Sequence, residues 1–511
     1  MPVNIGNIEV PDDRDAKFSQ KFGEFYEKRK RLAQAGVHIS PEQFDRTLTA
    51  RQLHDMQDAL IAARDAGQPL EDIYACAGRI VNIREHKRSS FIDLMEQSGR
   101  VQTFIDRSQL ADEQQLIYDN LDRGDFLGVR GSPFATRTGE PSIRAEELIL
   151  LGKTLRDVPD IGTPLDVETQ YRDRYLQLIV DPEANNRFRL RSKFIANIRR
   201  FMEENDFMEV ETPIVDSLAT GALAKPFGTH HNALDIDCQL RIAPEVPLKK
   251  LVIGGFERVY EVGKQFRNEG MSPEHMQEFT TMEFYWAYAN YQKLMEFTEE
   301  WFREVVGRTL GKTQFEHEGE TIDLAGSWQR KTFRELIQEY AGIDVDQYPE
   351  QVDLENAAQV ATGQDYTGKS TRGGTIDLLY KKNVRGRLVQ PTFILGHTAD
   401  ESPLARRSDV NPSLADRFQV VMGGTEVVNA YSELVDPIDQ RIRFEAQAKA
   451  KAAGDEEAHV IDHEYLRAME HGMPPIAGWG VGIDRLVMMM TQQKNIRDAV
   501  LFPIMRPRAL E

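Results

Sequence analysis

Residues 265–288 read QFRNEGMSPEHMQEFTTMEFYWAY and give the clearest indication of the fold. The apolar and polar residues on either side of the loop at 270–277 predict two strands joined as a charged hairpin. Its functional candidates are Arg267, Glu269, His275, Phe279 and Glu283. A planar guanidinium suits a phosphate or carboxylate, a ring can stack on a base, and a carboxylate can accept a hydrogen bond from an exocyclic amine. These groups meet the needs of an adenine nucleotide, and a solvated hairpin with cross-strand pairs is the alternative.

A second informative stretch, AGWGVGIDRLVMMM at 477–490, places three glycines before a strongly apolar helix. The spacing matches neither a dinucleotide-binding fingerprint nor a P-loop. It predicts a close approach to the backbone, followed by Arg485 at a helix start, where an anionic phosphate would be stabilised. Tight packing of a strand against a helix is the alternative interpretation.

Together with FMEVETPIV at 207–215, the two stretches resemble motifs 2, 3 and 1 of the class II aminoacyl-tRNA synthetases, and Pro213 matches the proline of motif 1. A small barrel ahead of this catalytic unit resembles subclass IIb, the lysyl, aspartyl and asparaginyl enzymes. The phrases FRNEG, APE and SEL resemble those of the lysyl-tRNA synthetase family. The resemblance to subclass IIb covers almost the whole chain, from about residue 70 to 507. The resemblance implies a multidomain α+β protein whose catalytic domain is built on an antiparallel sheet.

Five short strand patterns between residues 73 and 151 predict a small β-barrel. A helical stretch at 112–121 precedes the fourth strand, an order that fits the oligonucleotide-binding (OB) fold. Helical spacing near Phe22 and the stretch at 41–67, which ends in a glycine, predict helices ahead of the barrel. We expect a helical extension over 1–70, an OB-fold anticodon-binding domain over 71–157 and a class II catalytic domain over 170–511, with a helical insertion at about 330–390 that is broken at TRGGT, 371–375.

The composition, with 41% hydrophobic and 28% charged residues, is that of a globular protein. The formal charge of −19 argues against non-specific coating of nucleic acid but allows a locally basic face. No apolar run approaches the roughly 18 residues that span a membrane, and the polar N-terminus resembles no signal peptide. We therefore expect a cytoplasmic protein with no membrane association, in which Cys76 and Cys238 need not pair.

Charge distinguishes among the three amino acids of subclass IIb. The segments that the resemblance assigns to the amino-acid pocket carry Glu245, Glu283 and Glu433. Three carboxylates around one small ligand are costly unless the ligand is cationic, and lysine carries two ammonium groups. A pocket for aspartate would require cations instead. By resemblance, Gly221 and Glu245 would hold the α-ammonium group, Arg267 and Asn429 the carboxylate, and Glu283, Tyr285 and Glu433 the ε-ammonium group, with Tyr431 in place of the usual phenylalanine.

The resemblance also implies how ATP binds. Arg267 would contact the α-phosphate, His275 and Arg485 would lie nearer the γ-phosphate, and adenine would lie between Phe279 and Arg485. Glu269 and Glu426 complete the expected ATP-binding set, and Arg267 and Arg485 are the expected catalytic residues. Attack of the lysine carboxylate on the α-phosphate needs positioning and charge neutralisation but no covalent enzyme intermediate.

Magnesium binding is where the sequence departs from the family. Lysyl enzymes commonly carry two glutamates here, whereas the run DRFQVVMGGTE at 416–426 keeps Glu426 and has Gln419 in place of its partner. An amide oxygen can coordinate Mg²⁺ but brings no charge. We expect Mg²⁺ as a cofactor at Glu426, with the number of ions left open. Glu274 also stands where relatives have an arginine.

In the family, the barrel reads the anticodon by stacking bases on aromatic side chains and contacting their edges with polar ones. Phe91, Gln102 and Glu140 occupy matching positions, with Arg79 nearby. An ordinary barrel surface is the alternative.

The resemblance implies the reaction of a lysine-tRNA ligase: ATP-dependent activation of L-lysine and its transfer to tRNA(Lys), by a homodimer paired through motif 1. An aspartyl or asparaginyl enzyme is the nearest rival and should show a cation where Glu245 or Glu433 lies. A second rival lysylates proteins, and such relatives tend to lack the barrel. A third, an oligonucleotide-binding module with a structural C-terminal region, would bind no ATP.

Overall fold

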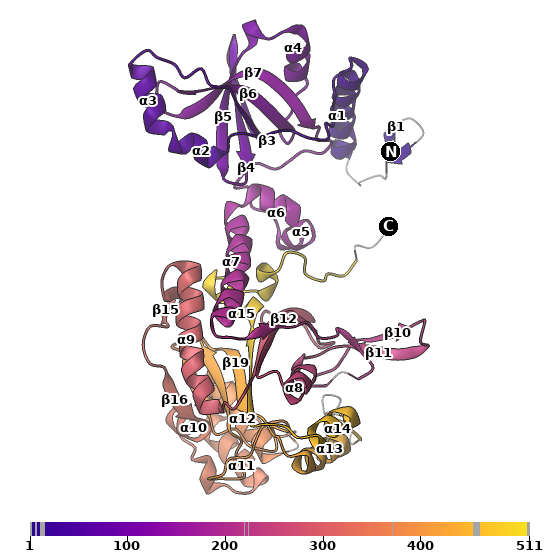
Figure 1. Ribbon diagram of the computed structural model, residues 1–511, viewed down its shortest axis with the longest axis vertical. Helices are drawn as coiled ribbons and strands as arrows, with labels where there is room; N and C mark the ends of the chain where they lie inside the picture. The colour runs from indigo at the N-terminus through magenta and orange to yellow at the C-terminus, as the bar shows by residue number, and fades with distance from the viewer. Residues whose placement is uncertain are drawn as a thin grey trace. The chain divides into compact units, whose positions relative to one another are not determined.

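The computed structural model describes residues 3–5, 8–10, 16–218, 220–222, 224–369, 371–452 and 460–507 (Figure 1). The chain divides into two compact units, residues 1–166 with 175–181 and residues 167–174 with 182–511. Within the described ranges, no helix combines the length and the apolar character needed to cross a bilayer. Cys76 and Cys238 are buried free thiols.

The first unit contains a closed five-stranded barrel with strand order β3-β4-β5-β7-β6. Its strands are β3 (Tyr74–Glu85), β4 (Ser89–Glu96), β5 (Gly99–Asp106), β6 (Phe126–Ala135) and β7 (Pro141–Gly152), and α4 (Asp112–Asp119) follows β5. All neighbouring strands are antiparallel except β5 and β7. Alternate residues such as Ile80, Ile92 and Leu94 point inward and are fully buried. The expected five-stranded OB-fold barrel with a helix before its fourth strand is confirmed.

Helices precede the barrel, but the stretch at 41–67 is not one continuous helix. The elements here are the β1 (Val3–Ile5) and β2 (Ile8–Val10) pair, α1 (Ala16–Gln34), α2 (Ala50–Asp55) and α3 (Gln57–Asp65). Residues 41–49 are not helical, because Thr49 caps the start of α2. Its hydroxyl accepts from the Gln52 N–H at 3.3 Å, and the Gln52 side chain accepts from the Thr49 N–H at 2.9 Å. This reciprocal capping box starts a helix at Ala50.

The second unit is built on an eight-stranded sheet with order β16-β17-β18-β19-β20-β13-β12-β8. The strands are β8 (Met208–Glu209), β12 (Arg258–Phe266), β13 (Glu278–Ala287), β16 (Gln329–Thr332), β17 (Thr392–Leu395), β18 (Arg417–Met422), β19 (Thr425–Ser432) and β20 (Ile476–Gly482). The two outer pairs, β16 with β17 and β12 with β8, are parallel, and all other pairs are antiparallel. The expected antiparallel catalytic sheet and its β12–β13 hairpin are confirmed.

One face of this sheet is covered by α7 (Pro182–Glu204), α9 (Tyr291–Leu310) and α15 (Ile483–Met490), which share one apolar core with it (Figure 1). The rings of Phe284 and Trp479 stack at 5.1 Å in this core, and Trp301 of α9 lies 5.2 Å from Trp479. Successive strand residues point to opposite faces. Burial of Phe284 and Trp479 therefore turns their sequence neighbours to the other face, where the cavity lies.

The range expected as a helical insertion contains α10 (Phe333–Ala341), α11 (Gln351–Thr362) and α12 (Arg372–Asn383), which pack around their own apolar cluster. The TRGGT stretch is not a break between helices. Thr371 caps α12 by accepting from the Gly374 N–H at 2.9 Å, so both glycines lie in the first turn of the helix.

The other helices and strands lie outside the eight-stranded sheet. They are α5 (Val167–Arg172), α6 (Arg174–Val180), α8 (Glu245–Ile253), α13 (Pro437–Ala452), α14 (His463–Glu470), the three-stranded sheet of β9 (Val215–Asp216), β10 (Gly228–His231) and β11 (Ile236–Leu240), and the hairpin of β14 (Gln314–His317) and β15 (Glu320–Asp323). Of these, α8 matters most for the site, because it begins at Glu245.

Candidate active site

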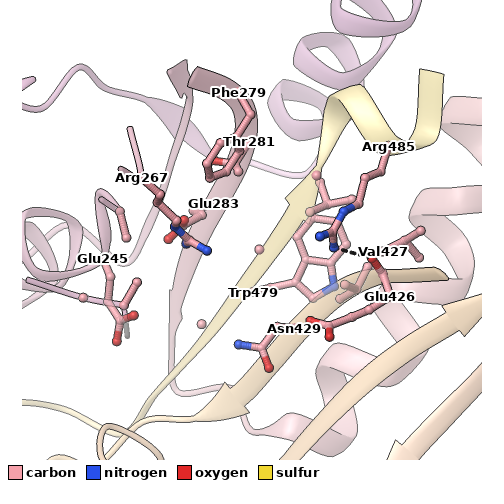
Figure 2. A pocket seen from close by; sticks show the side chains of 18 of the residues that line it. Glu245, Arg267, Phe279, Thr281, Glu283, Glu426, Val427, Asn429, Trp479 and Arg485 are labelled. Atoms are coloured by element: carbon pink, nitrogen blue, oxygen red, sulfur yellow. Dashed lines mark hydrogen bonds between the residues drawn. The ribbon is translucent and has the colours of Figure 1, made fainter. Parts of the chain in front are cut away.

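A cavity of about 360 Å³ lies on the polar face of the eight-stranded sheet (Figure 2). It brings together most of the site residues expected from the sequence. Those that line it are Gly221, Glu245, Arg267, Glu269, His275, Phe279, Glu283, Tyr285, Glu426, Asn429, Tyr431 and Arg485. Glu433 lies just behind the lining, and Gln419 lines a different cavity. Residues more than 200 positions apart in sequence thus converge on one hollow.

The register of three neighbouring strands, β19, β20 and β13, explains this convergence. Two rows cross the sheet, with Asn429, Gly480 and Glu283 opposite one another in one, and Tyr431, Gly478 and Tyr285 in the next. To these two rows the middle strand β20 contributes only Gly478 and Gly480, which form the glycine floor of the cavity. A Cβ on Gly478 would collide with a Glu433 carboxylate oxygen and lie 2.5 Å from the Tyr285 ring. The glycines therefore allow a close approach to the backbone, as the sequence predicts, and the groups that approach are side chains of the pocket.

Lys249 is an important residue that the sequence analysis did not identify. It is fully buried, and its Nζ lies 2.5 Å from Glu245 Oε1 and also pairs with Glu433. Burial opposes the charge on Lys249, but the Glu245 and Glu433 carboxylates outweigh it and raise the pKa of the lysine. The signal in the sequence is the four-residue spacing from Glu245 within the short helix α8.

Glu245 is held by two polar contacts at the inner end of the cavity, and Gly221 lies close beside it. Besides Lys249, the Tyr431 hydroxyl donates to Glu245 Oε1 at 2.8 Å, so the tyrosine that replaces the family's phenylalanine adds a hydrogen bond. Gly221 has φ +94°, and a Cβ there would lie 2.9 Å from the Glu245 Cβ. Only glycine allows the loop to approach α8 this closely.

Glu283 is a carboxyl at the inner end whose pKa is raised. Burial and the neighbouring Glu245 raise the pKa of its carboxyl from the usual 4.5 to about 8, against the opposing effect of Arg267. Figure 2 shows the Arg267 and Glu283 side chains pointing into the same space. A second cation near this carboxylate would be favourable, so the inner end suits a ligand with an ammonium group.

Arg267 and Asn429 mark the middle of the cavity. The Arg267 Nε–H donates to the Ile242 carbonyl at 3.4 Å, and its guanidinium carbon lies 5.1 Å from the Phe279 ring centroid. Asn429 Oδ1 accepts from Arg417 Nε at 2.9 Å. Arg417, a further residue missed from sequence, lines the cavity as well.

The outer end is formed by the hairpin loop and the start of α15. Arg485 Nη1 donates to the Glu426 carbonyl at 2.8 Å, the bond dashed in Figure 2, and Arg485 Nη2 lies 2.9 Å from His275 Nε2. Desolvation and Arg485 lower the pKa of His275, so its neutral ring accepts this bond, while Nδ1 contacts Ser272 Oγ at 2.8 Å. The cation beside the Phe279 ring in this structure is Arg267 and not Arg485.

Glu426 is the candidate metal ligand that lines the main cavity. Gln419 lines a smaller cavity of about 160 Å³, whose wall shares Glu401 and Arg417 with the main one. In the described part of the chain, no group of three His, Cys, Asp or Glu side chains is placed to hold a metal. The donor set fits Mg²⁺, because this ion is commonly bound by one or two carboxylates together with substrate phosphates.

The outer surface of the barrel places Phe91, Gln102 and Glu140 close together. Phe91 lies opposite Phe104 in the β4–β5 register, and Gln102 lies opposite Ser142. Gln102 Oε1 accepts from Ser142 Oγ at 2.9 Å, and Glu140 pairs with Arg100 at 2.7 Å. Arg79 is engaged differently: it donates to the Gly124 carbonyl at 2.9 Å and lies 4.3 Å from the Phe126 ring centroid.

An aromatic row extends this surface beyond the residues found from sequence. The Phe91 and Phe104 rings lie 5.2 Å apart, and Phe104 lies 6.0 Å from Phe134. Arg144 lies over both Phe104 and Phe134, at 5.5 and 5.1 Å. Phe104 follows Gln102 by two positions, so strand periodicity could have identified it.

Comparison with known proteins agrees with both units. Residues 166–506 match the family of class II tRNA synthetases for D, K and N, and residues 74–151 match the OB-fold nucleic acid binding domain. A lysine-tRNA ligase of Moorella thermoacetica is 44% identical over 94% of this chain and 97% of the relative. Relatives of the same name from Thermotoga maritima and Lactococcus lactis subsp. lactis are 42% and 43% identical, over 96% and 94% of this chain and 97% of each relative. The chain belongs to the class II tRNA synthetases, within the lysine-tRNA ligase family.

Proposed function

We propose that this protein activates L-lysine with ATP to form lysyl-adenylate and transfers the lysyl group to the 3′ end of tRNA(Lys). The observation that carries the proposal is the inner end of the cavity, where Glu245, Glu283 and Glu433 meet around one hollow. Lys249 supplies one cation to these three carboxylates, so the cluster favours a further cation and would repel the carboxylate side chain of aspartate. The 42–44% identity to lysine-tRNA ligases agrees with this specificity.

The two ammonium groups of lysine would be recognised at separate points. Glu245, beside Gly221, is the proposed acceptor for the α-ammonium group. Glu433 and Glu283, with the Tyr285 hydroxyl, would surround the ε-ammonium group. Charge-assisted hydrogen bonds of this kind are about twice as strong as neutral ones, and the buried setting strengthens them further.

Activation would take place in the middle of the cavity. Arg267 and Asn429 would orient the substrate carboxylate, and Arg267 would also neutralise charge developing on the α-phosphate as the carboxylate attacks it. Arg485 and His275 would hold the outgoing pyrophosphate, with Glu269 and Phe279 on adenine. This division needs no covalent enzyme intermediate, since positioning and charge neutralisation account for catalysis of phosphoryl chemistry.

Magnesium would be held by Glu426 together with the phosphates of ATP. When bound, the ion would neutralise negative charge on the phosphates. Gln419 brings no charge to this end, so the protein contributes one carboxylate where relatives commonly contribute two.

The barrel would bind the anticodon stem-loop of tRNA(Lys), with Phe91 stacking on a base and Gln102 and Glu140 contacting base edges. Arg79 would support the same surface from its place over Phe126. We further propose that the protein acts in the cytoplasm as a homodimer paired through the motif 1 segment at 207–215.

Amino-acid-dependent exchange of pyrophosphate into ATP tests this proposal. The assay is run with each of the twenty amino acids, with magnesium and without tRNA. Exchange stimulated by lysine alone is the expected result, and stimulation by aspartate or asparagine would contradict the assignment of the pocket. A following assay of lysine transfer to tRNA(Lys) separates a tRNA ligase from an enzyme that lysylates proteins, because only the former charges tRNA.

A further inference from the structure

We propose that Lys249 is a positioning residue that fixes the spacing of Glu245 and Glu433 and so sets the length of the diamino acid accepted by the pocket. This inference rests on the proposed activation of lysine and deepens it. It assigns a role to a residue that touches no substrate and acts only through the two carboxylates.

The Lys249 ammonium group bridges the carboxylates of Glu245 and Glu433. Lys249 and Glu245 lie one turn apart on α8, and their Nζ and Oε1 atoms are separated by 2.5 Å. The same Nζ pairs with Glu433, which follows the sheet strand β19. One ammonium group therefore joins a helix to the end of a strand through the two carboxylates.

The surroundings keep the bridge in place. Lys249 and Glu433 are 0% and 1% exposed, so neither has room to change rotamer freely. The Lys249 Nζ lies 5.8, 5.7 and 5.8 Å from the ring centroids of Tyr285, Tyr431 and Tyr465. Aromatic faces at this distance attract a desolvated cation.

A fixed separation of Glu245 and Glu433 would select substrates by the distance between their two ammonium groups. Glu245 is the proposed acceptor of the α-ammonium group and Glu433 of the ε-ammonium group. Because one buried cation is bonded to both, it fixes their separation. Ornithine, which is one methylene shorter than lysine, could then satisfy only one of the two carboxylates at a time. A missing methylene in an ordinary apolar pocket is rejected only about 10- to 200-fold, so a fixed pair of charged acceptors would add discrimination.

A purely structural role for Lys249 makes a different prediction. Removing a counterion from buried carboxylates destabilises a protein because charge is left uncompensated. If stability were the whole effect, the fraction of active enzyme would fall equally for every substrate. A positioning role changes the preference between lysine and ornithine, a ratio that the active fraction does not affect.

The test compares Lys249→Met with the wild type in the pyrophosphate exchange assay, with lysine and ornithine as substrates. We expect the ratio of kcat/KM for lysine over ornithine to fall about tenfold, through a higher KM for lysine, while the KM for ATP stays within about twofold. Lys250→Met is the matched control, since Lys250 is the next residue on the same helix and its side chain is 36% exposed. It should retain the ratio of the wild type.

An unchanged lysine-to-ornithine ratio in Lys249→Met would overturn the inference. If that variant does not fold, the double variant Lys249→Met/Glu433→Gln replaces it, because it removes the buried lysine charge together with the charge of one of its two carboxylate partners. Its ratio should lie below that of Glu433→Gln alone, and equal ratios would overturn the inference. Absence of lysine-dependent exchange in the wild type would instead refute the proposed function, so the wild type is measured first.

Discussion

The two ends of the active-site cavity are built in different ways. At the inner end, Glu245 and Glu433 are buried and joined by Lys249. At the outer end, Glu269 and His275 are exposed on the hairpin loop between β12 and β13. The inner end is fixed before any ligand arrives, whereas the outer end presents exposed polar side chains that a bound nucleotide would organise.

This difference follows from what each end would recognise. An ammonium group on a flexible stem is selected against close analogues only by acceptors held in fixed positions, and buried ion pairs supply that rigidity at a desolvation cost. A triphosphate carries enough charge to order flexible side chains around it. Changes at the inner end should therefore alter selectivity, and changes at the outer end should alter rate.

The largest expected effect on activity comes from replacing Arg267, which lies between the two ends of the cavity. Arg267→Ala removes the guanidinium proposed to contact both the carboxylate and the α-phosphate. We expect kcat for lysine-dependent exchange to fall about 10² to 10³-fold, the loss typical of one transition-state contact. Arg330→Ala, which replaces an exposed arginine on strand β16, is the control and should leave kcat unchanged. A loss confined to the KM for lysine would show that Arg267 belongs to the inner end alone.

Glu433→Gln tests the inner end by removing one charge without changing shape. Loss of a charge-assisted contact should cost about 1.5 to 3 kcal/mol, which corresponds to roughly a 10- to 150-fold higher KM for lysine. The KM for ATP should not change, because the residue lies away from the outer end. Equal lysine kinetics in the variant and the wild type would refute the assignment of the pocket.

Gly478→Ala tests whether the glycine floor is required. The added Cβ would collide with Glu433 and lie 2.5 Å from the Tyr285 ring, and overpacking of this kind costs about 1 to 3 kcal/mol. We expect a higher KM for lysine together with a lower melting temperature. Gly326→Ala is the control, since nothing lies within 4 Å of its Cβ position. A variant with normal lysine affinity would mean that the floor is wider than the structure indicates.

The smallest expected effect is a proton released when lysine binds. Burial and Glu245 raise the pKa of Glu283 to about 8, so this carboxyl is mostly protonated at pH 7 in the free protein. A bound ammonium group favours the ionised form, so binding should release up to one proton, and lysine affinity should increase as the pH rises towards 8. Calorimetry in buffers of different ionisation enthalpy measures this release. Glu283→Gln should abolish it, and proton uptake by the wild type would contradict the assignment.

Much of the site could be predicted from the sequence, because the charge of the pocket side chains indicates the charge of the ligand that they can bind. The acidic set of Glu245, Glu283 and Glu433 pointed to a cationic ligand, and the structure places them at one end of the cavity. Lys249 was missed because it stands beside Lys250 in a short helix, and periodicity alone does not show which lysine faces inward. Its spacing from Glu245 was the available signal.

Other features of the site depend on the order of the strands in the sheet, which the sequence alone does not show. Period-two alternation places Gln419 on the same face as Arg417, but only the strand order shows that it lines the second cavity. The glycines before α15 indicated a close approach without naming the partner, which is the pair of Glu433 and Tyr285 side chains. The start of α2 was predictable from the capping pair Thr49 and Gln52.

The central claim is that fixed carboxylates at the inner end recognise the side-chain ammonium group. Calorimetric titration of the wild-type protein with lysine and with norleucine, which has the same stem without that ammonium group, tests it most directly. We expect lysine to bind at least about 100-fold more tightly, since two or more charge-assisted contacts are at stake. Equal affinities would show that the pocket selects an apolar stem and would contradict the account.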